Sequence, residues 1–122
     1  MTDEKMASWE DVDLWWRIAR KGQTPSLLAT EAAWKALAVA GLKPADIDLI
    51  ICATVTPDRQ IPATSCTIQE NLGARRAAAF DLAAGCSGYI YALAVADRFL
   101  ASGAYRNALV IGGEILSKYM DW

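Results

Sequence analysis

The sequence predicts an α/β fold in which helices alternate with the strands of a parallel sheet. Two continuous apolar runs, at 49–55 and 77–82, have the composition of strands that are buried on both faces, and 107–113 is predicted to be a third strand. Segments with helical spacing and glycine ends separate these runs. The 122 residues allow one domain, and right-handed crossovers are the expected connections in such a layer.

The first regular helix is predicted to run from Pro25 to the residue before Gly41. Thr24 is a residue type that caps helices, Pro25 suits the first helical position, and Gly41 is a typical helix end. Two helical rows are expected to form one wide apolar face: Ala29, Ala33, Leu37 and Ala40, together with Leu28, Ala32 and Ala36. A turn at 44–48 then leads into the first strand.

Two further helices come after the first and second strands. The loop at 56–62 contains two prolines and leads to a short helix at 63–72, which Gly73 ends. A longer helix is predicted at 86–101, with Gly103 just after it. Its buried face is expected to consist of Ile90, Leu93, Ala94, Ala96, Phe99 and Leu100.

Residues 1–24 differ in composition from the rest of the chain. We therefore predict that they form an N-terminal segment outside the α/β domain, which extends over 25–122. They are charged and carry three of the five tryptophans. Trp9, Val12, Trp16 and Ala19 fall at roughly helical spacing, which predicts a short amphipathic helix. The charged start lacks the long apolar core of a signal peptide.

Composition excludes several classes of function. The formal charge of −2 gives no reason to expect nucleic acid or an anionic membrane surface as a partner. No uninterrupted apolar run reaches about 18 residues, so a membrane span is not expected. Three cysteines without CxxC spacing favour a reducing cytoplasm over a disulfide framework, and we expect no metal site.

Cys86 carries the strongest chemical signal in the chain. It stands between the second strand and the long helix, where the first N–H groups of a helix are unpaired and its dipole is positive. This position favours a thiolate, and the same N–H groups can stabilise an oxyanion. Cys86 is therefore a candidate nucleophile, although a cysteine in an alanine-rich helix start is also often a small core residue. Cys52 and Cys66 are expected to be inert core thiols.

Four neighbours of these elements have a structural and a functional interpretation. Gly85 and Gly88 flank the thiol, and they either permit a tight turn and close packing or leave space for an acyl thioester. Both roles are compatible. Asp81 is expected to serve as a turn or cap residue rather than as a charge at the site. Glu114, after the third strand, is expected to be structural.

Four segments together match a known pattern: 47–54 (IDLIICAT), 80–89 (FDLAAGCSGY), 102–103 (SG) and 109–114 (LVIGGE). They resemble the N-terminal half of 3-oxoacyl-[acyl-carrier-protein] synthase III, a condensing enzyme of type II fatty acid synthesis. The resemblance covers about residues 17–122. It implies a thiolase-like α/β fold of which this chain is an incomplete N-terminal half.

The resemblance also implies a reaction. The cysteine that matches Cys86 takes an acyl group from acyl-CoA as a thioester, so acyl-CoA is a substrate and no cofactor is expected. Malonyl-acyl carrier protein is then decarboxylated, and its carbanion attacks the thioester. Ile61, before Pro62, matches the residue that closes the acyl pocket of the dimer mate, and Gly85 and Gly88 are the other substrate-binding candidates. The full-length family implies a cytoplasmic homodimer.

The sequence departs from the family in three respects. The family's catalytic histidine and asparagine belong to its second half, and this chain contains no histidine. The CoA-binding segment is not recognisable, so no CoA ligand is assigned. The family's first strand and the strand that comes after residue 122 are missing, so we expect 49–55 to pair with 77–82 while 107–113 loses its neighbours on both sides.

These departures leave two further hypotheses about the chain. The alternative function is a non-catalytic fragment that associates with an intact condensing enzyme. A chain with partial chemistry would acylate itself slowly at Cys86 without turning over malonyl substrate. An unpaired strand and exposed apolar helix faces also predict aggregation.

Overall fold

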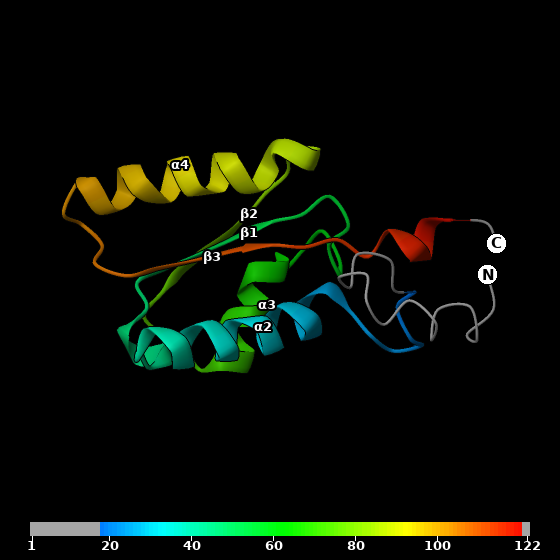
Figure 1. Cartoon of the computed structure of the whole chain (residues 1–122), viewed down its shortest axis with the longest axis horizontal. Coiled ribbons are helices and arrows are strands. Elements are labelled where there is room, and N and C mark those ends of the chain that lie inside the picture. The colour runs from blue at the N-terminus through cyan, green and yellow to red at the C-terminus, as the bar shows by residue number, and fades with distance from the viewer. Residues whose placement is uncertain (1–17, 121–122) are drawn as a thin grey trace.

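The computed structural model describes residues 18–120 and shows three layers (Figure 1). Helices α2 (Pro25–Ala40) and α3 (Thr64–Leu72) cover one face of a three-stranded sheet. Helix α4 (Gly88–Ala101) covers the other face. The helix predicted from Trp9, Val12, Trp16 and Ala19 lies largely outside the described residues.

The sheet consists of β1 (Leu49–Ala53), β2 (Ala78–Leu82) and β3 (Ala108–Gly112) in the order β2-β1-β3, with both pairs parallel. The expected α/β class is confirmed. The prediction that 107–113 has no strand neighbour is wrong, because β3 pairs with β1 from Ala108 to Gly112. The central strand β1 has backbone N–H and C=O groups on both of its edges. Pairing with β2 on one edge and β3 on the other satisfies more of these groups than pairing with β2 alone.

Burial differs between the strands. All five residues of β1 are buried, as the apolar run predicts. β2 is exposed at Ala78 and only half-buried elsewhere, so the expectation of burial on both faces is wrong for this strand. The reason is its position: within the described residues, β2 lies at an edge of the sheet, whereas β1 lies at the centre.

Helix α2 begins and ends as predicted. The Thr24 hydroxyl accepts a hydrogen bond from the N–H of Leu27, and Gly41 ends the helix with a φ of +67°. The wide apolar face is wrong, since Leu28, Ala32, Ala36 and Ala40 are exposed. Only a narrow stripe that includes Ala33 and Leu37 reaches the core, where it meets residues such as Ile50 and Ile68.

Helix α4 is placed correctly, but of the face predicted to be buried only Ala96 is buried and Phe99 half-buried. Its buried residues are Gly88, Ala92 and Ala96, while Ile90 is 67% exposed. Leu93, Ala94 and Leu100 are also exposed. Residues 88–96 contain no charged side chain, so the pattern does not select a face. The small residues Gly88, Ala92 and Ala96 face the sheet, because they allow the helix to approach it closely.

The connection into β3 is tied to the start of β1 by one carboxylate. Asp48 accepts hydrogen bonds from the backbone N–H groups of Arg106 and Asn107, and these bonds lower the pKa of its carboxyl group. Among the residues that the structure describes, no helix combines the length and the apolar character that crossing a membrane requires.

Candidate functional site

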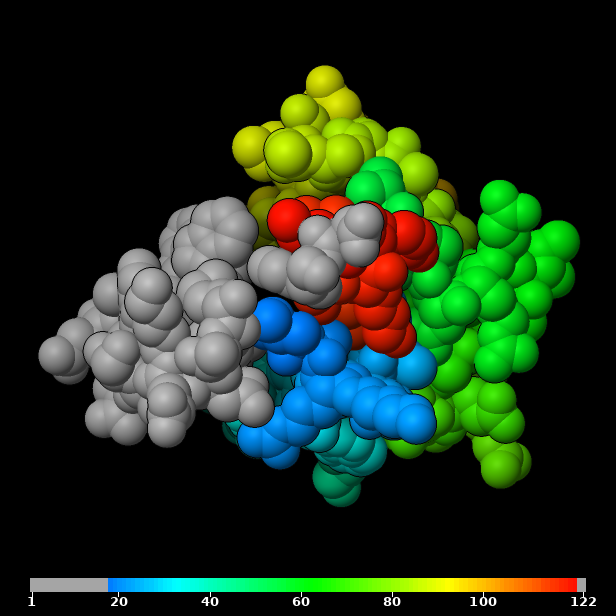
Figure 2. All heavy atoms as spheres, turned by 90° about the vertical axis from the view of Figure 1, so that its right-hand side faces the viewer, coloured from blue at the N-terminus to red at the C-terminus, as the bar shows by residue number. Residues whose placement is uncertain are grey.

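The predicted site residues gather at one end of the sheet. Parallel strands all finish on the same edge, and the loops that leave this edge are where ligands bind in α/β folds. The loops at 54–63, 83–87 and 113–115 leave it after β1, β2 and β3. Figure 2 looks onto this end of the molecule, with the start of α4 above, the segment after β3 in red and the loop around residue 60 in green at the right.

Cys86 lies in the second of these loops and is exposed. It occupies the middle of a short 3₁₀ turn, Gly85–Ser87, in which the N–H of Gly88 donates to the carbonyl of Gly85. The helix predicted from residue 86 therefore begins two residues later, at Gly88. The thiol precedes the helix instead of standing in its first turn. Its exposure excludes the interpretation of Cys86 as a core residue.

Both flanking glycines have the structural roles that the sequence suggested. Gly85 has a φ of +54°, which L residues with a side chain rarely adopt, and so it permits the turn. A Cβ on Gly88 would lie 3.4 Å from the Cβ of Ala53, which is ordinary contact at the end of β1. Gly88 thus packs directly on the sheet. The further role of these glycines as space for an acyl thioester stays a prediction.

Asp81, near the end of β2, caps helix α3. Its two carboxylate oxygens accept hydrogen bonds of 2.8 Å each from the N–H groups of Thr64 and Ser65. Both donors belong to residues that are fully buried, where water does not reach them. A negative carboxylate also suits the positive end of the helix dipole. The expected cap role of Asp81 is confirmed.

Glu114 ties the end of β3 to the loop after β1. Its carboxylate accepts hydrogen bonds from the N–H groups of Val55 and Thr56, at 2.8 and 2.9 Å, and from the hydroxyl groups of Thr54 and Thr56. The hydroxyl of Thr56 in turn accepts the N–H of Ile115. Glu114 therefore has the structural role that its position predicted.

Asp58 anchors the loop after β1, a role that the sequence pattern did not predict. Asp58 accepts hydrogen bonds from the N–H and the hydroxyl of Ser26, and its own N–H donates to the hydroxyl of Thr64. These contacts join the start of α2, the loop and the start of α3. Ser26 and Asp58 are 32 positions apart, and no local pattern links them.

Ile61 lies between Asp58 and α3 in the same loop. Its side chain is 88% exposed, and its peptide bond to Pro62 is cis. An apolar side chain held in solvent at a loop tip is available to a partner or to another part of a larger protein. The pocket-closing role that the resemblance implies for Ile61 remains a prediction.

The other two thiols differ from each other. Cys52 is buried in β1, as expected, and burial raises the pKa of its thiol to about 12, with the carboxylates of Asp81, Glu114 and Asp58 adding to the rise. Cys66 is half-buried on α3, so its assignment to the core is wrong. Its Sγ lies 3.9 Å from the carbonyl oxygen of Ala79 in β2.

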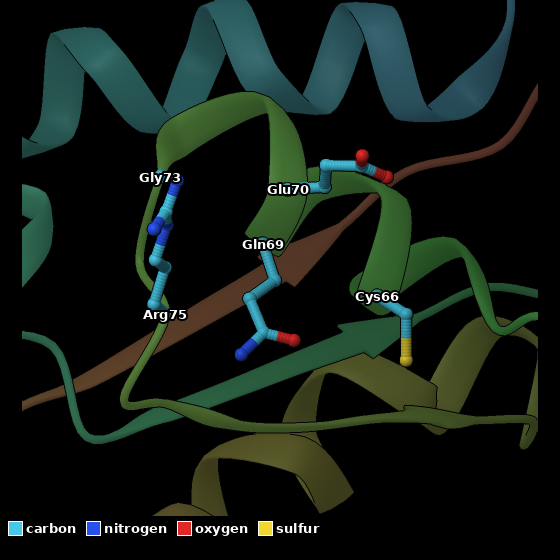
Figure 3. A pocket seen from close by; sticks show the side chains of 5 residues that line it. All are labelled: Cys66, Gln69, Glu70, Gly73 and Arg75. Carbon is cyan, nitrogen blue, oxygen red and sulfur yellow. The ribbon is translucent and has the colours of Figure 1, made fainter.

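Cys66 lines a shallow pocket of about 340 Å³ together with Gln69, Glu70, Gly73 and Arg75 (Figure 3). The pocket lies beside α3, away from the carboxyl ends of the strands. The amide of Gln69 donates to the carbonyls of Ala74 and Ala77, so it serves the connection into β2. Within the described part of the chain, no three His, Cys, Asp or Glu side chains are grouped so that they could hold a metal ion.

The three cysteines are expected to react with iodoacetamide in a fixed order. Cys86 should be modified first and Cys66 more slowly, and Cys52 only when the protein unfolds. The pKa of the Cys52 thiol in the folded protein lies above its usual value of about 8.5. The neutral thiol therefore contributes to the free energy of unfolding at pH values below about 8.5, and this contribution is lost as the pH rises through the folded pKa. Peptide mapping across alkaline pH checks the order, and equally fast modification of Cys52 and Cys86 in the folded protein would contradict it.

Comparisons with known proteins agree with this geometry. The family model for 3-oxoacyl-[acyl-carrier-protein (ACP)] synthase III matches residues 80–122, which include Cys86. The beta-ketoacyl-[acyl-carrier-protein] synthase III of Caldanaerobacter subterraneus subsp. tengcongensis is 58% identical over 106 residues, which are 87% of this chain and 32% of the relative. The corresponding protein of Bordetella petrii is 55% identical over 105 residues, which are 86% and 32% of the two chains.

A solved structure gives the same result. The 3-oxoacyl-[acyl-carrier-protein] synthase III from Aquifex aeolicus superposes with a TM-score of 0.83 at 50% identity, covering 87% of this chain and 34% of that one. The fold is therefore thiolase-like. In sequence, the chain is similar to 3-oxoacyl-[acyl-carrier-protein] synthase III, as the resemblance predicted. The chain spans about a third of the length of the curated relatives it matches.

Proposed function

We propose that this chain supplies the nucleophile-bearing part of an acyltransferase of fatty acid biosynthesis. The whole enzyme would condense an acyl-CoA starter with malonyl-acyl carrier protein through a cysteine thioester. The observation that carries the proposal is the exposed thiol of Cys86, in the turn between β2 and α4 at the carboxyl edge of the sheet. The similar proteins from Caldanaerobacter and Bordetella are named beta-ketoacyl-[acyl-carrier-protein] synthase III, which supports the proposal.

The first step requires only groups near Cys86. The thiolate attacks the thioester carbonyl of acyl-CoA, the carbonyl oxygen becomes an oxyanion, and the CoA thiolate then leaves and takes up a proton. The acyl group remains on Sγ of Cys86. The backbone N–H of Cys86 is the donor that we assign to the oxyanion, since it belongs to the turn that carries the thiol.

The second step requires residues that this chain does not contain. Decarboxylation of the malonyl group yields a carbanion, which attacks the acyl carbon on Sγ and releases the 3-oxoacyl product and the Cys86 thiolate. The resemblance assigns the support of decarboxylation to a histidine and an asparagine of the family's second half. This chain has no histidine, so we expect it to accept an acyl group without completing the condensation.

The proposal includes a homodimer in the cytoplasm. Ile61 would enter the acyl pocket of the dimer mate, and its 88% exposure supports a role outside its own subunit. The free thiols of Cys52, Cys66 and Cys86 support a reducing compartment. Acyl-CoA serves as a substrate, and the proposal needs no cofactor.

Release of CoA tests the first step. On incubation with acetyl-CoA, the chain should release one equivalent of CoA per folded molecule and then stop. The Cys86→Ala variant should release none. Cys66→Ala is the matched control, because it removes a half-buried thiol outside the proposed site, and it should behave as the wild type. Equal release from wild type and Cys86→Ala would refute the proposal.

The alternative function, a non-catalytic fragment that associates with an intact condensing enzyme, is favoured by the outer face of α4. Ile90 is 67% exposed there, with Leu93 beside it on the same side of the helix. Size-exclusion chromatography with an intact synthase III should show a complex that Ile90→Asp abolishes. Val39→Asp on α2, where the side chain is 91% exposed, is the control and should leave it intact. Separate elution of the wild-type chain would exclude this function.

A further inference from the structure

The first two residues of α4 touch the ends of all three strands. Gly88 meets the end of β1, where an added Cβ would lie 3.4 Å from Cβ of Ala53, and a side-chain carbon of Leu82 in β2 at 3.9 Å. Tyr89 lies against Gly112, the last residue of β3. The start of α4 is thus fitted onto the carboxyl edge of the sheet at two adjacent positions.

The contact at Gly112 leaves no room for a side chain. A Cβ on Gly112 would lie 2.9 Å from Cδ2 of Tyr89, and 3.2 Å from both its Cβ and its Cγ. Separations below 3.0 Å do not persist between such atoms. Rotating the tyrosine ring would move Cδ2 but not Cβ, which is fixed to the backbone of α4. An added methyl group would therefore press on the helix itself.

The backbone beneath Tyr89 is held in place. The N–H of Gly113 donates to the carbonyl of Ala53, which extends the pairing of β3 with β1. The carboxylate of Glu114 holds the loop after β1 through four hydrogen bonds. These hydrogen bonds oppose a displacement of the strand ends. A larger residue at position 112 would therefore displace the start of α4.

The position of Cys86 depends on the start of α4. The turn that carries it is closed by the hydrogen bond from the N–H of Gly88 to the carbonyl of Gly85, so the turn moves when Gly88 moves. The Cys86 side chain is exposed and its place is set by the backbone on either side. Position errors of about 1 Å are enough to slow a reaction that depends on alignment.

We propose that Gly112 is a positioning residue for the nucleophile. The absence of a side chain at this position lets α4 begin against the strand ends and so places the Cys86 turn. The inference rests on the proposed function, in which Cys86 is the acylated group. Gly112 acts on Cys86 through Tyr89 and Gly88 and does not itself touch a substrate.

The chain offers a matched control at the next residue. Gly113 also comes after β3, but a Cβ there would meet nothing within 4 Å, and its φ is not positive. The substitutions Gly112→Ala and Gly113→Ala therefore add the same methyl group one residue apart, with and without the clash. Adding Tyr89→Ala to Gly112→Ala removes the ring against which the new methyl group would press.

The experiment measures the second-order rate of alkylation of Cys86 by iodoacetamide as a function of pH, with a urea melt of each variant. Gly112→Ala should lower the rate by about threefold or more and shift the pH profile, because displacing Gly88 distorts the turn that it closes and so changes the surroundings of the Cys86 thiol. Gly113→Ala should match the wild type. The double variant should regain most of the rate. The shift of the pH profile, measured where the urea melt shows each variant to be folded, distinguishes a displaced thiol from a loss of stability.

Two results would overturn the inference. One is a rate for folded Gly112→Ala that equals that of Gly113→Ala. The other is a defect, in rate or in folding, that the Tyr89→Ala substitution does not relieve. Alkylation does not involve CoA, so these outcomes are separate from the CoA-release assay: loss of CoA release in the wild type sinks the proposed function, whereas normal release with unaltered alkylation in Gly112→Ala sinks only this inference.

Discussion

A Glu114→Ala variant is expected to unfold with a free energy about 3 kcal/mol below that of the wild type. The carboxylate accepts two backbone N–H groups and two hydroxyl groups, and Thr54 and Thr56 are buried. Removing a charged acceptor takes this partner from the hydroxyls of the buried Thr54 and Thr56 and from the N–H of Val55, whereas the N–H of Thr56 keeps its bond to the hydroxyl of Thr54. Urea denaturation followed by circular dichroism measures the difference.

Glu31→Ala is the control for this variant. Glu31 is exposed on α2, and replacing an exposed glutamate by alanine within a helix changes stability by only about 0.5 kcal/mol or less. If both substitutions changed the unfolding free energy equally, Glu114 would not hold the two strand ends together.

An Asp81→Ala variant is expected to lose about 2–3 kcal/mol of unfolding free energy. Its carboxylate satisfies the N–H groups of Thr64 and Ser65 at the buried start of α3, and alanine leaves both unpaired. The favourable charge at the positive end of the helix dipole is lost as well. Hydrogen exchange at these two amides should accelerate together with the fall in stability.

Asp97→Ala provides the comparison. Asp97 pairs with Arg98 on α4, but their side chains are 63% and 79% exposed, and such surface pairs contribute only about 0–1 kcal/mol. A loss for Asp81→Ala no larger than that for Asp97→Ala would show that the cap is unimportant. Slow exchange at Thr64 and Ser65 in the variant would point the same way.

Features that depend on neighbouring residues could be predicted from the sequence. The cap at Thr24, the left-handed end at Gly41 and the buried strand β1 all result from residue type and local pattern. The position of Cys86 between a strand and a helix was predictable for the same reason. Its exposure, which the sequence left open, depends on tertiary packing.

Features that depend on tertiary packing could not. Nothing within 107–113 indicates that this strand pairs with β1, because a parallel pair forms between segments far apart in the chain. Because the start of α4 is uniformly apolar, its sequence pattern does not indicate which face of the helix contacts the sheet. The contact between Gly112 and Tyr89 and the bond between Ser26 and Asp58 join residues that only the folded chain brings together.

Peptide mapping by mass spectrometry after incubation with acetyl-CoA tests the central claim most directly, since it locates the acetyl group among three thiols. We predict that the acetyl group is found on the peptide that contains Cys86, in thioester linkage, with Cys52 and Cys66 unmodified. Acetylation of Cys66 at the same level as Cys86, or an unmodified Cys86 in folded protein, would contradict the assignment of Cys86 as the nucleophile.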